Sequence, residues 1–103
     1  MRNRILGAEH LETIGAMANL AVTYHKLGKD AEAEKLEIQV LDARKRILGV
    51  ENPGTITAMA NLAATYRDLE KYTEAGKLEM QVLDARIRVL EWNIQQQSQP
   101  WQI

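Results

Sequence analysis

A six-residue stretch occurs twice in this chain, and the spacing of its two copies constrains the fold more than any other feature. Residues 16–21 read Ala-Met-Ala-Asn-Leu-Ala and recur letter for letter at residues 58–63, 42 positions later. When residues 6–47 are aligned with residues 48–89, 27 of the 42 positions are identical. A repeat of this length is typical of a solenoid, whose units bury their apolar faces only by stacking on one another. The sequence therefore predicts a tandem-repeat protein.

The composition excludes several kinds of partner. The 13 Lys and Arg residues balance 14 Asp and Glu residues, leaving a formal net charge of −1, so nothing favours nucleic acid or an anionic membrane as a partner. The absence of cysteine removes disulfides and thiolate metal ligands. No apolar stretch approaches the roughly 20 residues of a membrane helix, and the N-terminus has no signal-peptide pattern. We expect a soluble, cytoplasmic protein.

Each copy is expected to form a helical hairpin. In the first copy, apolar residues at three- and four-residue spacing predict a helix over about residues 13–27, after a loop that ends at residue 12. The same period resumes over about residues 31–48. A three-residue turn between two amphipathic helices makes them antiparallel, and the small side chains of Ala21 and Ala33 would allow a close crossing.

The second copy repeats this plan. Its helices are expected over about residues 55–69 and from Tyr72 or Thr73 to Leu90 or beyond, with Pro53 at the start of the first. Residues 2–6 match residues 44–48 at four of five positions. The chain therefore opens on the tail of a preceding unit. We expect a piece of a longer array, and a truncated first unit is the alternative.

The last part of the chain, residues 91–103, lacks the repeat pattern. Glutamine is a fair helix former, so the final helix could continue to about Gln97, before Pro100. Four apolar residues could cap the exposed flank of the last hairpin, and a frayed end is the alternative. These residues are Trp92, Ile94, Trp101 and Ile103.

The expected fold class is all-α, an α-solenoid of two hairpins. Residues 1–90 form the array, with repeats at about 7–48 and 49–90, and residues 91–103 form an extension. The apolar members of the repeated hexapeptide are expected to lie in the core. They are Met17, Leu20, Ala21, Met59, Leu62 and Ala63.

The two units resemble tetratricopeptide repeats, in particular the 42-residue variety found in kinesin light chains and in fungal and bacterial signalling ATPases. The resemblance covers about residues 2–90. It is carried by Leu-Gly at residues 6–7 and 48–49, Thr-Ile at 13–14 and 55–56, Asn-Leu-Ala at 19–21 and 61–63, Tyr24 and Tyr66, and Ala-Arg at 43–44 and 85–86. The resemblance implies a right-handed superhelix in which the first helix of each hairpin lines a concave face that holds a peptide or a partner helix.

Three positions depart from the family pattern. Leu11 stands where the family usually has proline, Glu70 replaces a turn glycine, and Gly76 replaces a glutamate. Glycine inside a helix costs roughly 0.5–1 kcal/mol relative to alanine. Family members that hold a free carboxylate use lysine and asparagine at the positions of Ala18 and Val22, so a carboxylate clamp is not expected here.

Asn19 and Asn61 are the main candidates for contact with a partner. Asparagine is unfavourable inside a helix, so its recurrence at one position asks for a reason. One interpretation is a ladder of side-chain amides that bonds the backbone of an extended peptide, which the resemblance supports. The alternative is a hydrogen bond between helices that fixes their packing. Seven neighbours complete the predicted contact surface, namely Val22, His25, Lys26, Thr57, Ala64, Arg67 and Asp68.

No catalytic, cofactor or metal site is expected. His10 and His25 are the only histidines, and no carboxylate pairs with either at the spacing of a ligand motif. His25 is therefore interpreted as a solvated side chain and His10 as part of a loop. The recurring basic pairs near the ends of the second helices match the helix dipole and are interpreted as a solvated face. These residues are Arg44, Arg46, Arg86 and Arg88.

The sequence thus predicts a non-catalytic protein-interaction module that binds a peptide or partner helix on its concave face, oriented by Asn19 and Asn61. The alternative is self-association. Two hairpins fall short of the three or so units that a solenoid usually needs, so a second copy could cover the exposed ends or exchange a hairpin.

Overall fold

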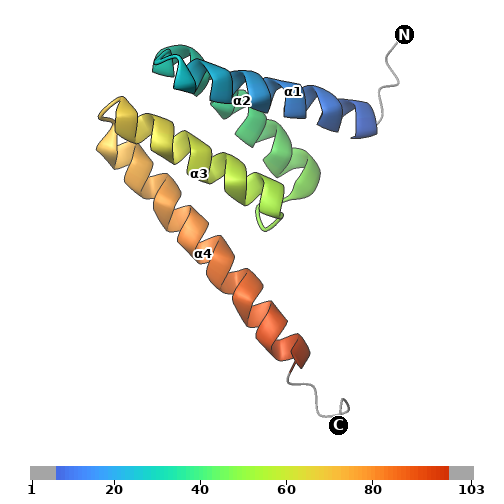
Figure 1. Ribbon diagram of the computed structural model, residues 1–103. Coiled ribbons are helices and arrows are strands. Elements are labelled where there is room, and N and C mark those ends of the chain that lie inside the picture. The colour runs from blue at the N-terminus through green and yellow to red at the C-terminus, as the bar shows by residue number, and fades with distance from the viewer. Residues whose placement is uncertain (1–6, 98–103) are drawn as a thin grey trace.

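The computed structural model describes residues 7–97, which form four α-helices (Figure 1). They are α1 (Gly7–Lys26), α2 (Asp30–Leu48), α3 (Pro53–Asp68) and α4 (Tyr72–Gln97). Each helix packs against the next one in the chain. The predicted all-α hairpin array is therefore confirmed for the described residues. Among these residues, no helix has the length and apolar character of a membrane span.

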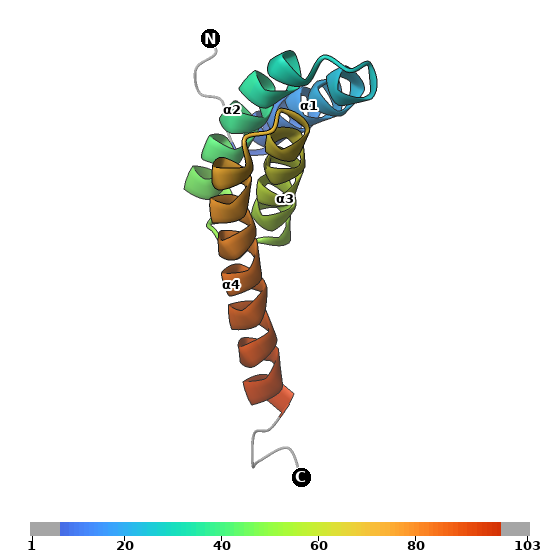
Figure 2. The ribbon, with the colours of Figure 1, turned by 90° about the vertical axis from the view of Figure 1, so that its left-hand side faces the viewer.

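The helices form two layers. Figure 2 shows α1 and α3, the first helices of the two hairpins, on one side, and α2 and α4 on the other. The second hairpin stacks on the first mainly through contacts between α2 and α3. The first helices therefore share one face of the molecule, which is the face that a tetratricopeptide-like stacking would make concave.

Both hairpins close with the same type of turn. Gly28 has a φ of +78°, and its counterpart Glu70 has a φ of +63° although it carries a side chain. The backbone N–H of Lys71 donates to the carbonyl of Tyr66 at 2.7 Å, which is the long-range bond of a Schellman cap. The Glu70 departure thus keeps the turn, at a conformational cost of about 1 kcal/mol.

Helix α1 begins earlier than expected, so the predicted loop is wrong for residues 7–12. In the second copy, Pro53 occupies the first helical position, and the Asn52 side chain caps the helix by accepting from the Gly54 N–H at 2.8 Å. The first copy has Leu11 where the second has Pro53. Because leucine has no restriction against a preceding helical residue, α1 extends back to Gly7.

The core is centred on α3, which packs against both α2 and α4. Ten buried residues form its apolar cluster. They are Ile14, Val40, Leu41, Ile56, Ala58, Met59, Leu62, Ala63, Leu78 and Ala85. Half of them belong to α3, whereas α1 contributes only Ile14. The two small residues of the first hairpin, Ala21 and Ala33, are buried as expected.

The prediction that Leu20 lies in the core is wrong. Leu20 is 44% exposed, whereas its counterpart Leu62 is 3% exposed. Met17 is half-buried and packs against the edge of the cluster. The cause is position in the array, because α3 is flanked by helices on both sides and no described hairpin precedes α1.

Polar contacts fix the two hairpins relative to each other. The Arg44 guanidinium donates to the Gly54 carbonyl at 3.0 Å, and the Thr55 hydroxyl donates to the Arg44 carbonyl at 3.3 Å. Lys71 donates to Glu34 at 2.9 Å. The interpretation of Arg44 as a solvated side chain is therefore wrong, because it holds the connection between α2 and α3.

Helix α4 runs to Gln97, as expected, and projects beyond the two hairpins (Figure 1). Trp92 and Ile94 remain at least half exposed on it. At this exposure Trp92 gives no support to the cap interpretation, one of the two that the sequence left open. The other two candidate cap residues, Trp101 and Ile103, lie outside the described residues.

Candidate binding groove

A hollow of about 190 Å³ opens between α1 and α3, and we call it the inter-repeat groove. Three helices supply its walls. The lining residues are Val22, His25 and Lys26 of α1, Glu37 of α2, and Asn61, Ala64 and Thr65 of α3. Five of the nine predicted contact residues therefore come together in one place.

The two asparagines do not share this groove. Asn61 lines it from α3, whereas Asn19 faces solvent on α1 and lies outside it. The equivalent groove for Asn19 would need the first helix of a preceding hairpin. Both amides are exposed, and neither makes a hydrogen bond through its side chain to another described residue. Their contacts therefore do not include the helix-to-helix bond that was the alternative interpretation.

The floor of the groove holds a carboxyl group that sequence reasoning missed. Glu37 is 7% exposed, and its Oε1 atom has no hydrogen-bond partner among the described residues. Burial raises the pKa of Glu37, while the adjacent Thr65 hydroxyl and the charge of His25 oppose the shift. The Thr65 Oγ1 atom is buried as well and makes no well-aligned hydrogen bond. Both atoms thus lie next to each other beneath the groove, without well-aligned hydrogen bonds among the described residues.

The second copy shows the same carboxyl position with a partner. Glu79, the counterpart of Glu37, accepts two hydrogen bonds from Arg67, one of them at 3.0 Å. This pairing lowers the pKa of Glu79 and raises that of Arg67. The first copy has His25 in place of Arg67, and Glu37 keeps an open acceptor.

His25 occupies one end of the groove and is not a solvated side chain, so that interpretation is wrong. Its Nδ1 atom lies 3.1 Å from a carboxylate oxygen of Asp30, and its Nε2 atom lies 3.2 Å from one of Asp68. The imidazole therefore bridges all of α1, α2 and α3. Asp68 itself is not among the lining residues and adjoins the groove only through His25.

The same cluster meets a geometric criterion for a metal site, because one ligand atom each of His25, Asp30 and Asp68 lies within 4.8 Å of the others. Each ring nitrogen, however, faces a different carboxylate. A metal ion bound to one ring nitrogen would also need the carboxylate that faces the other ring nitrogen. That carboxylate would have to leave its present position. The contact between Nδ1 and Asp30 lacks hydrogen-bond geometry, because both atoms are buried without a hydrogen-bond partner among the described residues.

The remaining predicted contact residues lie elsewhere. Arg67 is on the exposed side of α3, where it is engaged by Glu79. Thr57 lines a different hollow, of about 410 Å³, between α3 and the outer half of α4. That hollow lies where a following hairpin would pack.

A further hollow, of about 370 Å³, lies between α2 and α4 on the opposite layer. Its floor is apolar, with Leu41, Leu62 and Leu78, and its rim carries both signs of charge. Among its lining residues none is a buried polar group with an open bonding position. It therefore lacks the feature that distinguishes the inter-repeat groove.

A sequence signal for Glu37 existed. It stands four residues after Ala33 and three before Val40, both buried on α2, so the helical period alone places it on the packed face. The recurrence of glutamate at position 79 strengthens that signal. The contact between His25 and Asp68 carries no such signal, because it depends on how the two hairpins stack.

Two stacked antiparallel hairpins with a groove between their first helices define an α-solenoid repeat protein. Residues 16–88 match the tetratricopeptide repeat family. This match covers more than half of the chain, and the protein belongs to the tetratricopeptide repeat family. Repeats of this family are generally non-catalytic modules for protein–protein interaction. No curated protein matches the chain.

Proposed function

We propose that the inter-repeat groove binds an extended segment of a partner protein, and that the chain works as a cytoplasmic, non-catalytic interaction module of the 42-residue kind found in kinesin light chains. The observation that carries the proposal is that the groove contains both an exposed amide and a buried hydrogen-bond acceptor. Asn61 stands at the wall of the groove, and Glu37 below it has an oxygen without a donor. A bound segment would supply that donor.

The size of the groove supports a peptide rather than a small metabolite. Its volume of about 190 Å³ is below the roughly 300–1,000 Å³ of typical small-molecule pockets. A side chain of an extended segment can enter such a hollow while the backbone lies along the exposed helix surface. The amide of Asn61 can then donate to a backbone carbonyl and accept from a backbone N–H.

The charge of the groove favours a hydrogen-bond donor in the entering side chain. An uncharged hydroxyl or amide would satisfy Glu37 and would be tolerated by Lys26 at the rim. A carboxylate would lie against the buried Glu37 carboxyl and be repelled. This arrangement agrees with the expected absence of a carboxylate clamp.

The test uses the two asparagines as a matched pair. A peptide is selected from a displayed random library on the intact protein, and its affinity is measured by fluorescence anisotropy. Asn61→Ala should weaken binding by about fivefold, because it removes hydrogen bonding worth about 1 kcal/mol. Asn19→Ala, an identical change outside the groove, should leave the affinity unchanged. Equal effects of the two substitutions would contradict the proposal.

We also propose a second function, self-association. Large apolar side chains are exposed at both ends of the described array, including Leu20 on α1 and Leu83 on α4. Exposed apolar surface of this extent typically marks an interaction site. Sedimentation that shows only monomer at all accessible concentrations would contradict this second proposal and leave the first untouched.

A further inference from the structure

Helix α4 has a second apolar face that no described helix covers. Met80, Leu83, Ile87 and Leu90 follow one another at spacings of three, four and three residues, and we call them the α4 seam. Their exposed fractions lie between 43 and 72%. Ile94, half exposed, continues the same spacing one turn further. A three–four spacing places such side chains in one stripe along a helix.

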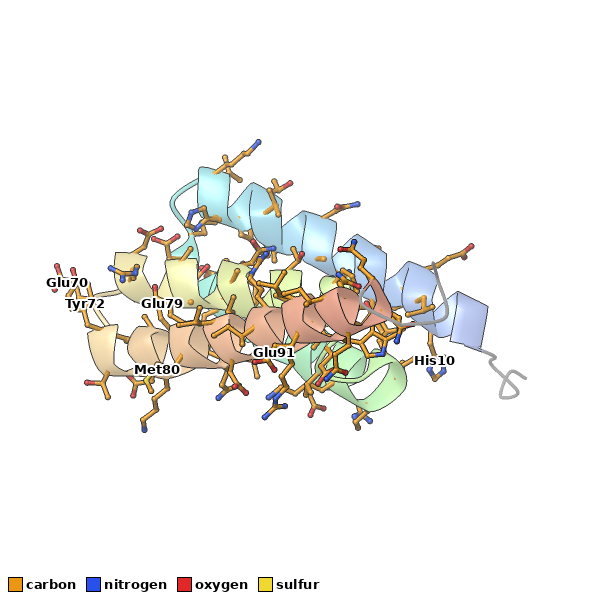
Figure 3. The ribbon with its side chains drawn as sticks, turned by 90° about the horizontal axis from the view of Figure 1, so that it is seen from below. His10, Glu70, Tyr72, Glu79, Met80 and Glu91 are labelled. Atoms are coloured by element: carbon orange, nitrogen blue, oxygen red, sulfur yellow. The ribbon has the colours of Figure 1, made fainter. Side chains whose placement is uncertain are left out.

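The α4 seam is distinct from the face that packs in the core. The buried residues of α4 are Ala75, Leu78 and Ala85, which point toward α3. Figure 3 shows Met80 on the outer side of α4, while Glu79 beside it lies toward α3. The outer half of α4 projects past the hairpins (Figure 1), so the end of the seam is open to a partner.

Comparison with α2 shows that this stripe is more than the docking face for another hairpin. On α2 the counterparts Leu41 and Leu48 are at least partly covered by the second hairpin. Between them, however, α2 has the exposed Lys45 where α4 has Ile87. The first copy thus tolerates a charge at this position when a hairpin docks, whereas α4 places a β-branched apolar residue there.

The C-terminal end of α4 also differs from that of α2 in a way that extends the apolar stripe. Gly49, which ends α2 with a φ of +88°, is replaced in the second copy by Glu91. The helix therefore continues for more than a further turn, to Gln97. In this continuation Ile94 takes the place of Asn52. The changes between copies make the stripe on α4 both longer and more apolar than the one on α2.

We propose that the α4 seam pairs with the α4 seam of a second copy in a parallel, two-stranded coiled coil. This inference rests on the proposed self-association and names its surface. In heptad terms, Met80 and Ile87 occupy a positions and Leu83 and Leu90 occupy d positions. Isoleucine at a with leucine at d favours parallel dimers.

The flanking charges select the parallel orientation. A parallel pair places Arg86, at a g position, against Glu91 of the partner subunit, at an e position, and the symmetry axis repeats this favourable contact. An antiparallel pair would instead place Asp84 against Glu91 of the partner subunit, two negative charges. Arg88 lies 2.9 Å from Asp84 within the same chain and reduces any repulsion at Asp84 in either orientation. The preference for the parallel orientation therefore rests on the attraction between Arg86 and Glu91 of the partner subunit.

One further g–e contact in the parallel dimer joins two acidic residues, Glu79 and Asp84 of the partner subunit. Both charges are offset within their own chain. Arg67 bonds Glu79, and Arg88 lies 2.9 Å from Asp84. The repulsion at this contact is thereby reduced.

The first test measures the dimer by sedimentation equilibrium of the full chain over a wide concentration range. Ile87→Lys copies the residue that the first repeat has at this position and should raise the dimer dissociation constant by about a hundredfold or more, because both copies lose a buried isoleucine. Leu83→Lys should act similarly. Trp92→Lys removes an exposed aromatic residue at an f position, outside the seam, and should leave the constant unchanged. Far-UV circular dichroism checks that each variant stays helical.

The second test measures orientation. The chain has no cysteine, so Gln97→Cys introduces a single thiol at the next d position. In the parallel dimer the two thiols meet at a Cα separation of about 6 Å, within disulfide reach, and mild oxidation should cross-link the chains. In an antiparallel dimer that pairs Ile87 with Leu90 they would lie about 25 Å apart. Adding Ile87→Lys should abolish the cross-link.

The outcomes are distinguishable. A chain that stays monomeric at every concentration overturns both the self-association and the seam. A dimer that survives Ile87→Lys and Leu83→Lys overturns the seam but leaves self-association through another surface, such as hairpin exchange. A dimer that depends on the seam but does not cross-link through Cys introduced at position 97 overturns the parallel orientation.

Discussion

Truncating Leu62 to alanine should cost the protein far more stability than truncating Leu20, although both leucines occupy the same position of the repeat. Leu62 is 3% exposed and lies in the core cluster beside Leu41 and Leu78, whereas Leu20 is 44% exposed. A buried Leu→Ala substitution costs about 2–5 kcal/mol, because a cavity adds to the lost apolar burial. Leu20→Ala opens no cavity and should cost about 1 kcal/mol. The expected difference is at least about 2 kcal/mol.

Urea denaturation followed by far-UV circular dichroism measures this difference. The experiment is done at a low protein concentration, so that self-association does not contribute to the free energy of unfolding. For a domain of this size, a difference of about 2 kcal/mol also corresponds to roughly 10 °C in the melting temperature. Leu27→Ala serves as a control, because Leu27 is even more exposed than Leu20.

Equal losses for Leu20→Ala and Leu62→Ala would refute the reasoning. They would mean that the first helix is as well covered in solution as the third, and that burial follows the repeat position rather than the neighbours. An increase in the cost of Leu20→Ala with protein concentration would instead assign the missing cover to a second copy.

Two further substitutions test the energetics of single positions. Burial raises the pKa of Glu37. The protonated Glu37 side chain is therefore compatible with the fold in acid, and stability is lost as the pH rises through the raised pKa and the side chain ionises. Glu37→Gln should stabilise the protein by on the order of 1 kcal/mol at about pH 7 and have little effect near pH 4. Denaturation that gives the same change at both pH values would contradict this assignment. Gly76 lies inside α4, and a Cβ atom there would meet nothing within 4 Å. Gly76→Ala should therefore stabilise the protein by roughly 0.5–1 kcal/mol, measured by thermal unfolding. A loss of stability would contradict this expectation.

Local pattern was sufficient to predict the helices wherever the chain signals its own boundaries. Asp30–Leu48 follows a turn glycine and ends at Gly49, and its predicted bounds agree with the structure to one residue. The start of α1 was predicted too late, because the residues up to 12 were expected to form a loop. The replacement of proline by Leu11 removes the feature that begins α3, and a helix extends until something stops it.

Burial could not be predicted from the letters alone, as the repeated hexapeptide shows. Ala58 and Leu62 are buried in α3, whereas Ala16 and Leu20, the same letters in α1, are exposed. The difference is caused by neighbours that belong to other parts of the chain. The candidate site was predictable to the same extent. The period places Asn61 and Glu37 each on a face of its own helix, but it does not show that these two faces meet in one groove.

The two copies together suggest why the groove lies where it does. In the second copy, Arg67 satisfies Glu79, and both residues remain near the surface because no described hairpin follows. In the first copy, the second hairpin buries Glu37, and a histidine stands in the position of the arginine. A buried acceptor without a donor lowers stability, and ligand sites are often less stable than the fold alone would allow. Glu37→Gln should therefore raise the stability of the protein and weaken its affinity for the selected peptide. If both the stability and the affinity increase, the Glu37 carboxyl does not take part in binding.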